Sequence, residues 1–153
     1  PRGLAGTVHT FRYNWLDELD EALARCGDDL AAIVMEPTRN VDPAPGFLEG
    51  VRERADRLGA PLVFDEISAG WRLCLGGAHR LYGVMPDLAV FAKAMSNGFA
   101  MGAVIGRREV MQAAQDSFIS STYWTEGIGP AAGSSSGPAS HAPGAAARDD
   151  RGH

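Results

Sequence analysis

Residues 62–93 read LVFDEISAGWRLCLGGAHRLYGVMPDLAVFAK, and this stretch decides the fold of the chain. It holds two short apolar runs, residues 62–64 and 88–92, which end at Asp65 and at Lys93. A short apolar run bounded by turn residues is typical of a strand that is buried on both faces, as in a parallel sheet between helices. Open α/β sheets place their ligand sites at the carboxyl ends of such strands. We therefore expect a buried carboxylate and a buried amine at the same edge of the sheet.

The residues before this stretch predict one βαβ unit. An apolar run at 31–35 ends at Glu36, and a loop rich in Pro, Asn and Asp follows it. Residues 47–58 alternate apolar and charged positions at helical spacing, and Gly59 provides a helix stop. A crossover of this kind is right-handed and makes the strands on either side of the helix parallel.

Further helices and strands are expected on both sides of this unit. Asn14 can cap a helix over residues 15–26, with Trp15 on its apolar face, and Gly27 ends that helix. The other expected elements are a short helix around residues 78–82, a strand at 101–105 and a helix at 108–114. Together they predict an α/β fold with a mostly parallel sheet and flanking helices.

Composition and charge argue against several classes of partner. The chain has 153 residues, 45% of them hydrophobic, and a net charge of −5, which gives no basic surface for nucleic acid or for an anionic membrane. Its apolar runs are about five residues long, whereas a membrane-spanning helix needs roughly 20. The N-terminus lacks a signal-peptide pattern, so we expect a cytoplasmic protein. Cys26 and Cys74 are far apart without neighbouring ligand residues, which indicates neither a disulfide nor a metal site.

The chain divides into two parts by composition. Residues 1–132 are long enough to form one hydrophobic core. Beyond Ile128 the sequence holds only Gly, Ser, Pro, Ala, His and charged residues. Such a segment buries too little apolar surface to offset its ordering entropy, so we expect residues 133–153 to be a disordered, low-complexity tail.

Two interpretations of Asp65 and Lys93 follow from their chemistry. Burial disfavours the ammonium form of a lysine, which frees the amine to form a Schiff base with a carbonyl. A buried aspartate stays ionised beside a cation, and a protonated pyridine nitrogen is such a cation. Alternatively, Lys93 reaches solvent and Asp65 forms an ion pair with Arg72 or with Lys93 itself.

A set of motifs resembles the class III aminotransferases, which are fold-type I pyridoxal phosphate enzymes and include glutamate-1-semialdehyde aminomutase. The resemblance covers roughly residues 9–132. Its motifs are Met35-Glu36-Pro37, Gly46-Phe47-Leu48, the stretch 62–67 followed by Gly70-Trp71-Arg72, the stretch 82–88, and Lys93 with Gly98 and Gly102-Ala103 after it. The resemblance implies that residues 1–132 are part of the large, cofactor-binding domain of such an enzyme.

The resemblance implies roles for three residues around the cofactor, pyridoxal 5'-phosphate. Lys93 matches the Schiff-base lysine, which also moves the proton between the substrate and the cofactor. Asp65 matches the acid that binds the pyridinium nitrogen. Ile67 matches the aliphatic residue that packs on the face of the ring, and it is equally suited to the core.

Two more residues acquire expected roles, each with an alternative. Glu36 matches an acid near the substrate site, but it can equally form an ion pair with Arg39 or Arg72. Thr122 resembles the threonine that, in the family's homodimer, reaches the cofactor phosphate of the neighbouring subunit. The alternative for Thr122 is an ordinary surface turn.

The chain also departs from the family pattern. Ser96, Asn97 and Ala100 stand where the family usually has glycines and a proline, which leaves the geometry of that turn open. Ser68 stands where the family often has a longer residue that reaches the ring hydroxyl of the cofactor. The family's phosphate cradle and small domain are expected to fall outside this stretch, so we expect the isolated chain to bind the cofactor weakly and to show no turnover.

The function that the resemblance implies is pyridoxal phosphate-dependent transamination between a small amino donor and a keto or aldehyde acceptor. One alternative is an isomerase of the glutamate-1-semialdehyde 2,1-aminomutase type, which returns the amine to a neighbouring carbon of the same molecule. Another is a truncated remnant without catalysis, whose sheet edges simply associate.

Overall fold

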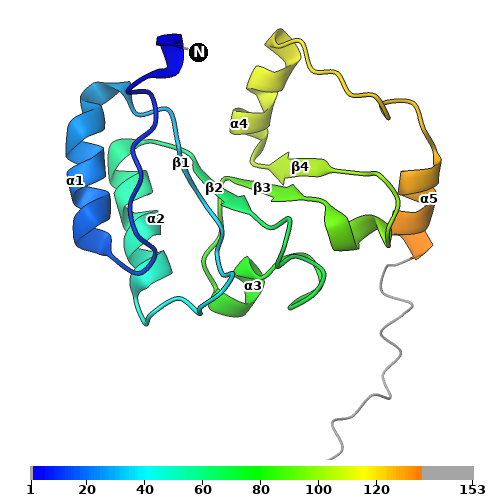
Figure 1. Cartoon of the computed structure of the whole chain (residues 1–153), viewed down its shortest axis with the longest axis horizontal. Coiled ribbons are helices and arrows are strands. Elements are labelled where there is room, and N and C mark those ends of the chain that lie inside the picture. Colours follow the sequence, from blue (N-terminus) through cyan, green and yellow to red (C-terminus); the bar gives the residue numbers. More distant parts are fainter. Residues whose placement is uncertain (1, 136–153) are drawn as a thin grey trace, which may run out of the picture.

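A four-stranded sheet forms the centre of the computed structural model, which describes residues 2–135 (Figure 1). Its strands lie in the order β1-β2-β3-β4. The first three are parallel, and β4 runs antiparallel to β3, which confirms the expected mostly parallel sheet. The strands are β1 (Ile33–Met35), β2 (Leu62–Asp65), β3 (Leu88–Phe91) and β4 (Ala103–Gly106).

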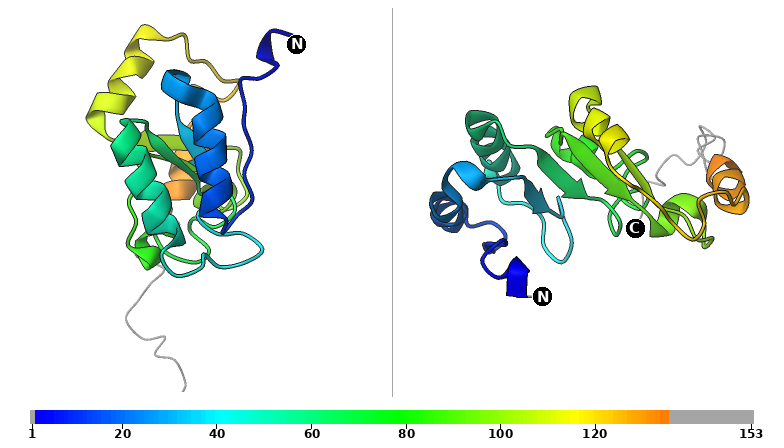
Figure 2. Two further views of the ribbon diagram at one scale, coloured as in Figure 1. Left: turned by 90° about the vertical axis from the view of Figure 1, so that its left-hand side faces the viewer. Right: turned by 90° about the horizontal axis from the view of Figure 1, so that it is seen from above.

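Two long helices, α1 (Leu16–Cys26) and α2 (Phe47–Leu58), lie side by side over the β1–β2 half of the sheet (Figure 2). Their apolar residues and those of the strands form one core, which includes Leu19, Val51 and Phe64. The shorter helical elements are η1 (Arg2–Leu4), η2 (Gly27–Asp29), α3 (His79–Tyr82), η3 (Lys93–Ser96), α4 (Arg108–Met111), η4 (Gln112–Asp116) and α5 (Ile128–Ser135). No helix among residues 2–135 combines the length and the apolar character needed to cross a membrane.

Only one face of the sheet is fully buried, which corrects the expectation of strands covered on both faces. In β2, Leu62 and Phe64 are fully buried, whereas Val63 and Asp65 are half-buried. In the neighbouring β1, Val34 is 62% exposed. The physical reason is that α1 and α2 both pack on the face that carries Leu62 and Phe64. The opposite face, which carries Asp65, remains accessible.

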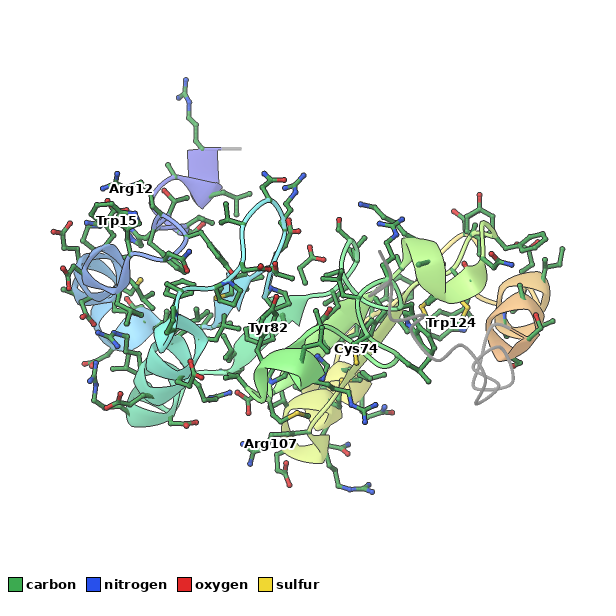
Figure 3. The ribbon with its side chains drawn as sticks, turned by 90° about the horizontal axis from the view of Figure 1, so that it is seen from below. Arg12, Trp15, Cys74, Tyr82, Arg107 and Trp124 are labelled. Atoms are coloured by element: carbon green, nitrogen blue, oxygen red, sulfur yellow. The ribbon has the colours of Figure 1, made fainter. Side chains whose placement is uncertain are left out.

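The start of α1 also differs from the prediction. Helix α1 begins at Leu16, and Asn14 does not cap it. Instead the Asn14 amide donates to Asp42 O at 3.1 Å and accepts from Ala44 N at 2.9 Å, so it ties the N-terminal segment to the loop after β1. Trp15 is 51% exposed, with the Arg12 guanidinium 4.1 Å from its ring centroid (Figure 3).

The last helix of the described chain, α5, runs three residues past the predicted start of the tail. Residues 133–135 continue α5, although the predicted tail begins at Gly133; the rest of that tail, 136–153, lies outside the described residues. Small residues let this helix approach η3 closely. A Cβ built on Gly133 lies 3.3 Å from Met95 O, and one on Gly129 lies 3.0 Å from Ala100 O. The helix therefore forms without large apolar side chains in its last turn.

A buried carboxylate at the start of β3 joins the helix layer to the sheet. Asp87 accepts from Leu62 N at 2.8 Å, from Arg52 Nη1 at 2.7 Å and from Arg107 Nη1 at 3.0 Å. Burial by itself raises the pKa of the Asp87 carboxyl, but the hydrogen bonds from Leu62 N and the two guanidinium groups outweigh burial and lower its pKa below the ordinary value. Asp87 thus connects α2, β2 and the segment after β4 while ionised.

Candidate functional site

The ends of β2 and β3 bring Asp65 and Lys93 to the same edge of the sheet, as predicted. Asp65 pairs with Val90 in the parallel register. Lys93 follows three residues later, which is roughly 10 Å further along the strand direction at about 3.3 Å per residue. An acid and an amine therefore lie at the carboxyl ends of adjacent parallel strands, Asp65 in β2 and Lys93 just after β3.

Lys93 is the single lysine of the sequence, and its amine is available for chemistry. Its Nζ donates to Ser68 Oγ at 2.9 Å, and no carboxylate among residues 2–135 forms an ion pair with it. The side chain is exposed, which corrects the expectation of a buried amine. Lys93 begins η3, beyond the end of β3, and the core that α1 and α2 form with the strands does not include it.

The backbone of Lys93 has φ +46°, in the left-handed region that is uncommon for a residue other than glycine. The turn that follows is closed by Ser96 Oγ, which donates to Phe99 O, and by positive φ at Asn97 (+51°) and Gly98 (+98°). Asparagine tolerates this region better than most residues. The turn therefore forms although the family's usual glycine is replaced at Asn97.

Asp65 has no cationic partner among the described residues. Its Oδ1 accepts from Ile67 N at 2.9 Å, a bond to the backbone two residues later that fixes the carboxylate and the start of the next loop. Arg72, the alternative partner, donates through Nη1 to Ser68 O at 2.9 Å instead. The intramolecular ion pair that was the alternative interpretation of Asp65 is absent from the described part of the chain.

Glu36 follows β1 at the level of Asp65, because Met35 pairs with Phe64. It forms an ion pair with Arg39, the alternative to a role near the substrate site, with Nη1 and Oε1 3.1 Å apart. Its second oxygen, Oε2, is buried and has no hydrogen-bond partner within the described structure. A pocket of about 240 Å³ lies here, lined by Tyr13, Glu36, Arg39, Asn40 and Val41.

Tyr13 is a residue of this region that the sequence did not indicate. Its hydroxyl donates to Pro37 O, and its ring packs edge-on against Phe47 with the centroids 4.9 Å apart. Burial raises the pKa of the Tyr13 phenol, and the nearby Tyr82 and Asp42 raise it further, so the hydroxyl remains a donor at neutral pH. Tyr13 therefore fixes the backbone that follows Glu36. The contact spans 24 positions and has no local sequence signal.

A second contact that the sequence did not indicate lies beneath the loop after Asp65. Glu66 is fully buried and accepts from Ala78 N and His79 N, each at 2.9 Å. Its Oε1 also lies 2.7 Å from Nδ1 of the buried His79. A Cβ on Gly77 would lie 2.5 Å from the His79 ring and 3.0 Å from Glu66 Oε1, so this approach requires glycine. The Glu66–His79 pair anchors the loop over residues 67–78 at both ends.

The remaining two candidates differ in position. Ile67 is half-buried and directly follows the Asp65–Glu66 step, so it lies beside the carboxylate. Thr122 is exposed and lies in a turn of the segment between η4 and α5, a segment that Figure 1 shows as an extended connection. Among residues 2–135, no hydrogen bond or ion pair joins Thr122 to Asp65 or Lys93. The structure thus groups Asp65, Ile67 and Lys93 at one edge, while the role of Thr122 stays a prediction.

Sequence comparison finds relatives along most of the chain. Residues 9–135 match the family described as Aminotransferase class-III. The chain is 43% identical over 136 residues to the 3-aminobutyryl-CoA aminotransferase of Cloacimonas acidaminovorans, covering 84% of this chain and 33% of that protein. It is 45% identical over 116 residues to the glutamate-1-semialdehyde 2,1-aminomutase 2 of Brevibacillus brevis, covering 73% and 27%.

Structural comparison agrees with this. A solved transaminase with PLP bound superposes with a TM-score of 0.82 at 27% identity, over 89% of this chain and 34% of the transaminase chain. The chain spans about a third or less of the length of these curated relatives. The family match covers far more than half of the sequence and includes both strand ends that carry the site. The chain belongs to the class III aminotransferase family.

Proposed function

We propose that this chain carries the cofactor-binding lysine of a pyridoxal phosphate-dependent aminotransferase. The observation that carries the proposal is the state of Asp65 and Lys93. They end adjacent parallel strands, yet neither forms an ion pair within residues 2–135. A carboxylate and an amine that have no ion-pair partner can each bind one end of the same ligand. Open α/β sheets commonly bind ligands at the carboxyl ends of their strands.

The chemistry of these residues fits pyridoxal phosphate. The Lys93 amine would bind the aldehyde carbon, the Asp65 carboxylate would accept a hydrogen bond from the protonated ring nitrogen, and Ile67 would offer an apolar contact to the ring face. When bound, the cofactor supplies an electron-withdrawing ring that stabilises negative charge at the substrate Cα. Asp65 keeps that ring nitrogen protonated.

The chain's own residues then handle the substrate. The free amine of Lys93 would act as the general base that takes the proton from the donor Cα. Glu36 is proposed to contact the donor or acceptor, since its buried Oε2 has no partner and borders a pocket beside the strand ends. An N–H or O–H group of the substrate would satisfy that oxygen.

A second candidate, an aminomutase, is favoured by the 45% identity to a glutamate-1-semialdehyde 2,1-aminomutase. The two reactions share the lysine and the cofactor and differ in the fate of the amine. A transferase releases a keto product, whereas an aminomutase returns the amine to a neighbouring carbon of the same molecule. Product analysis of the intact enzyme with an isotopically labelled amino donor distinguishes them.

Thr122 is proposed to act across a homodimer of the intact enzyme. The segment around it exposes an unusual number of large apolar side chains: Phe118, Ile119, Tyr123, Trp124 and Ile128. Apolar side chains gathered in this way are typical of a protein interaction surface. If a second copy of the chain binds at this surface, the Thr122 hydroxyl would donate a hydrogen bond to the cofactor phosphate of that copy. The expected cytoplasmic location also stays a prediction.

The test of the proposed function is covalent trapping on the single lysine. The purified chain is mixed with pyridoxal phosphate, reduced with borohydride, digested and examined by mass spectrometry. We expect the pyridoxyl group on Lys93, weak binding, and no turnover by this chain alone. Lys93→Arg keeps the positive charge and should remove the adduct. Because the sequence has no other lysine, an adduct confined to the N-terminal amine would contradict the proposal.

A further inference from the structure

The amine of Lys93 has a specific neutral partner, the hydroxyl of Ser68. The Nζ and Oγ atoms are 2.9 Å apart, and the two residues come from different loops, one after β2 and the other after β3. A serine hydroxyl both donates and accepts, so it can bind an ammonium group or a free amine. A carboxylate in this place could only accept, and it would favour the charged form that cannot attack a carbonyl.

The position of Ser68 is set by several bonds to its own loop. Arg72 Nη1 donates to Ser68 O at 2.9 Å, and Gly70 N donates to Glu66 O at 2.8 Å. A Cβ on Gly70 would lie 2.8 Å both from Glu66 O and from Phe91 Cδ1. The loop therefore lies directly against the last residue of β3, two positions before Lys93.

The buried Glu66–His79 pair holds the far end of the same loop. Three donors of residues 78 and 79 converge on the Glu66 carboxylate, which is fully buried directly after Asp65. An unpaired carboxylate would be costly at this depth, so the pair specifies one path for the loop. The bonds at both ends limit the movement of Ser68 relative to the sheet.

The backbone of Lys93 is held in an uncommon conformation, which restricts the directions that its side chain can take. A non-glycine residue in the left-handed region costs of order 1 kcal/mol, and such residues concentrate where function needs them. The observed φ of +46° places the chain in a 3-10 turn immediately after the strand. Both partners of the Nζ–Oγ bond are therefore held by backbone that has little freedom.

We propose that Ser68 is a positioning residue for Lys93: its hydroxyl holds the amine toward the strand ends, and the Glu66–His79 pair holds Ser68. This inference rests on the proposed role of Lys93 as the cofactor-binding lysine. The bond that the amine forms with an aldehyde carbon releases the carbonyl oxygen as water and needs no oxidant. Ser68 acts before that step, because it limits the rotamers that the amine samples.

The first test needs no cofactor. Lysine labelled with ¹³C at Cε gives one signal in this single-lysine chain, and its relaxation reports the mobility of the side chain. We expect restricted Cε motion in the native chain and in Ser68→Thr, which keeps the hydroxyl, and free motion in Ser68→Ala. Ser117→Ala is the matched control, because Ser117 is exposed and its hydroxyl donates to Ala113 O in η4, the helical segment directly before it. If Cε in the native chain moves as freely as in an unfolded peptide, the inference is overturned, and no variant is needed for that result.

The second test measures the rate at which pyridoxal phosphate forms the borohydride-stable adduct on Lys93. We expect Ser68→Ala to slow the reaction by about three- to tenfold, the factor that one hydrogen bond of ordinary net strength provides. Ser68→Thr and Ser117→Ala should stay within about twofold of the native rate. If Ser68→Ala and the native chain both form the adduct, and at equal rates, the positioning role of Ser68 is overturned while the proposed role of Lys93 stands. Absence of the adduct in the native chain overturns the proposed function instead, and the relaxation measurement still decides whether Ser68 holds the amine.

Discussion

Replacement of Asp87 by alanine is expected to lower the free energy of unfolding by about 3–5 kcal/mol, the cost of breaking a buried charge pair by removing one partner. Asp87 is 5% exposed, and its carboxylate satisfies Leu62 N and the guanidinium groups of Arg52 and Arg107. Without it, the buried Leu62 N–H loses its side-chain acceptor. The partly buried Arg52 keeps only its exposed partner Asp56 and a long contact to Met85 O. Urea unfolding at neutral pH, followed by circular dichroism, measures the change.

Asp56→Ala is the matched control for Asp87→Ala. Asp56 also forms an ion pair with Arg52, at 2.7 Å, but its side chain is 65% exposed. An exposed pair on one helix contributes about 0.3–0.5 kcal/mol. Equal losses of stability in the two variants would contradict the central place that we give to Asp87.

The same carboxylate gives the fold an acid-sensitive component. The pKa of Asp87 is lower in the folded chain than in the unfolded one, where it is about 3.9. The stabilisation from its charge is therefore complete above the unfolded pKa and is lost as the pH falls through the folded value. The difference in stability between the native chain and Asp87→Asn should shrink as the pH is lowered from about 5 to about 2. A constant difference over this range would show that the charge contributes nothing.

Phe64→Ala is expected to have a comparably large effect, about 3–5 kcal/mol, because the substitution leaves a cavity in the core. Phe64 is fully buried between the strand and the two helices, one residue before Asp65. Phe118, which is 97% exposed, offers the same substitution without burial, and Phe118→Ala should change stability by less than about 0.5 kcal/mol. Similar midpoints for the two variants in urea unfolding would refute the proposed core.

Local patterns in the sequence were sufficient to predict the parallel strands and the edge of the sheet that carries Asp65 and Lys93. The apolar run that ends at Asp65 and the helical spacing of 47–58 each lie within a few residues, so β2 and α2 were predicted at their observed positions. The parallel register follows from the crossover and brings Asp65 and Lys93 to one edge.

Contacts between distant residues account for what the sequence did not predict. Asn14 bonds Asp42 and Ala44 instead of capping α1, and Tyr13 bonds Pro37. Periodicity reports the face of an element that is apolar, but it does not report which neighbour covers that face. The exposure of Lys93 and the one-sided burial of the sheet therefore became visible only in three dimensions.

The central claim is that Asp65 and Lys93 hold the two ends of one pyridine ring. A crystal structure of the borohydride-reduced complex measures this directly, because reduction fixes the ring to Nζ. We predict the ring nitrogen within about 2.7–2.9 Å of an Asp65 carboxylate oxygen, the length of a charge-assisted hydrogen bond. A ring joined to Lys93 whose nitrogen faces solvent, with Asp65 bound only to Ile67 N, would contradict the account.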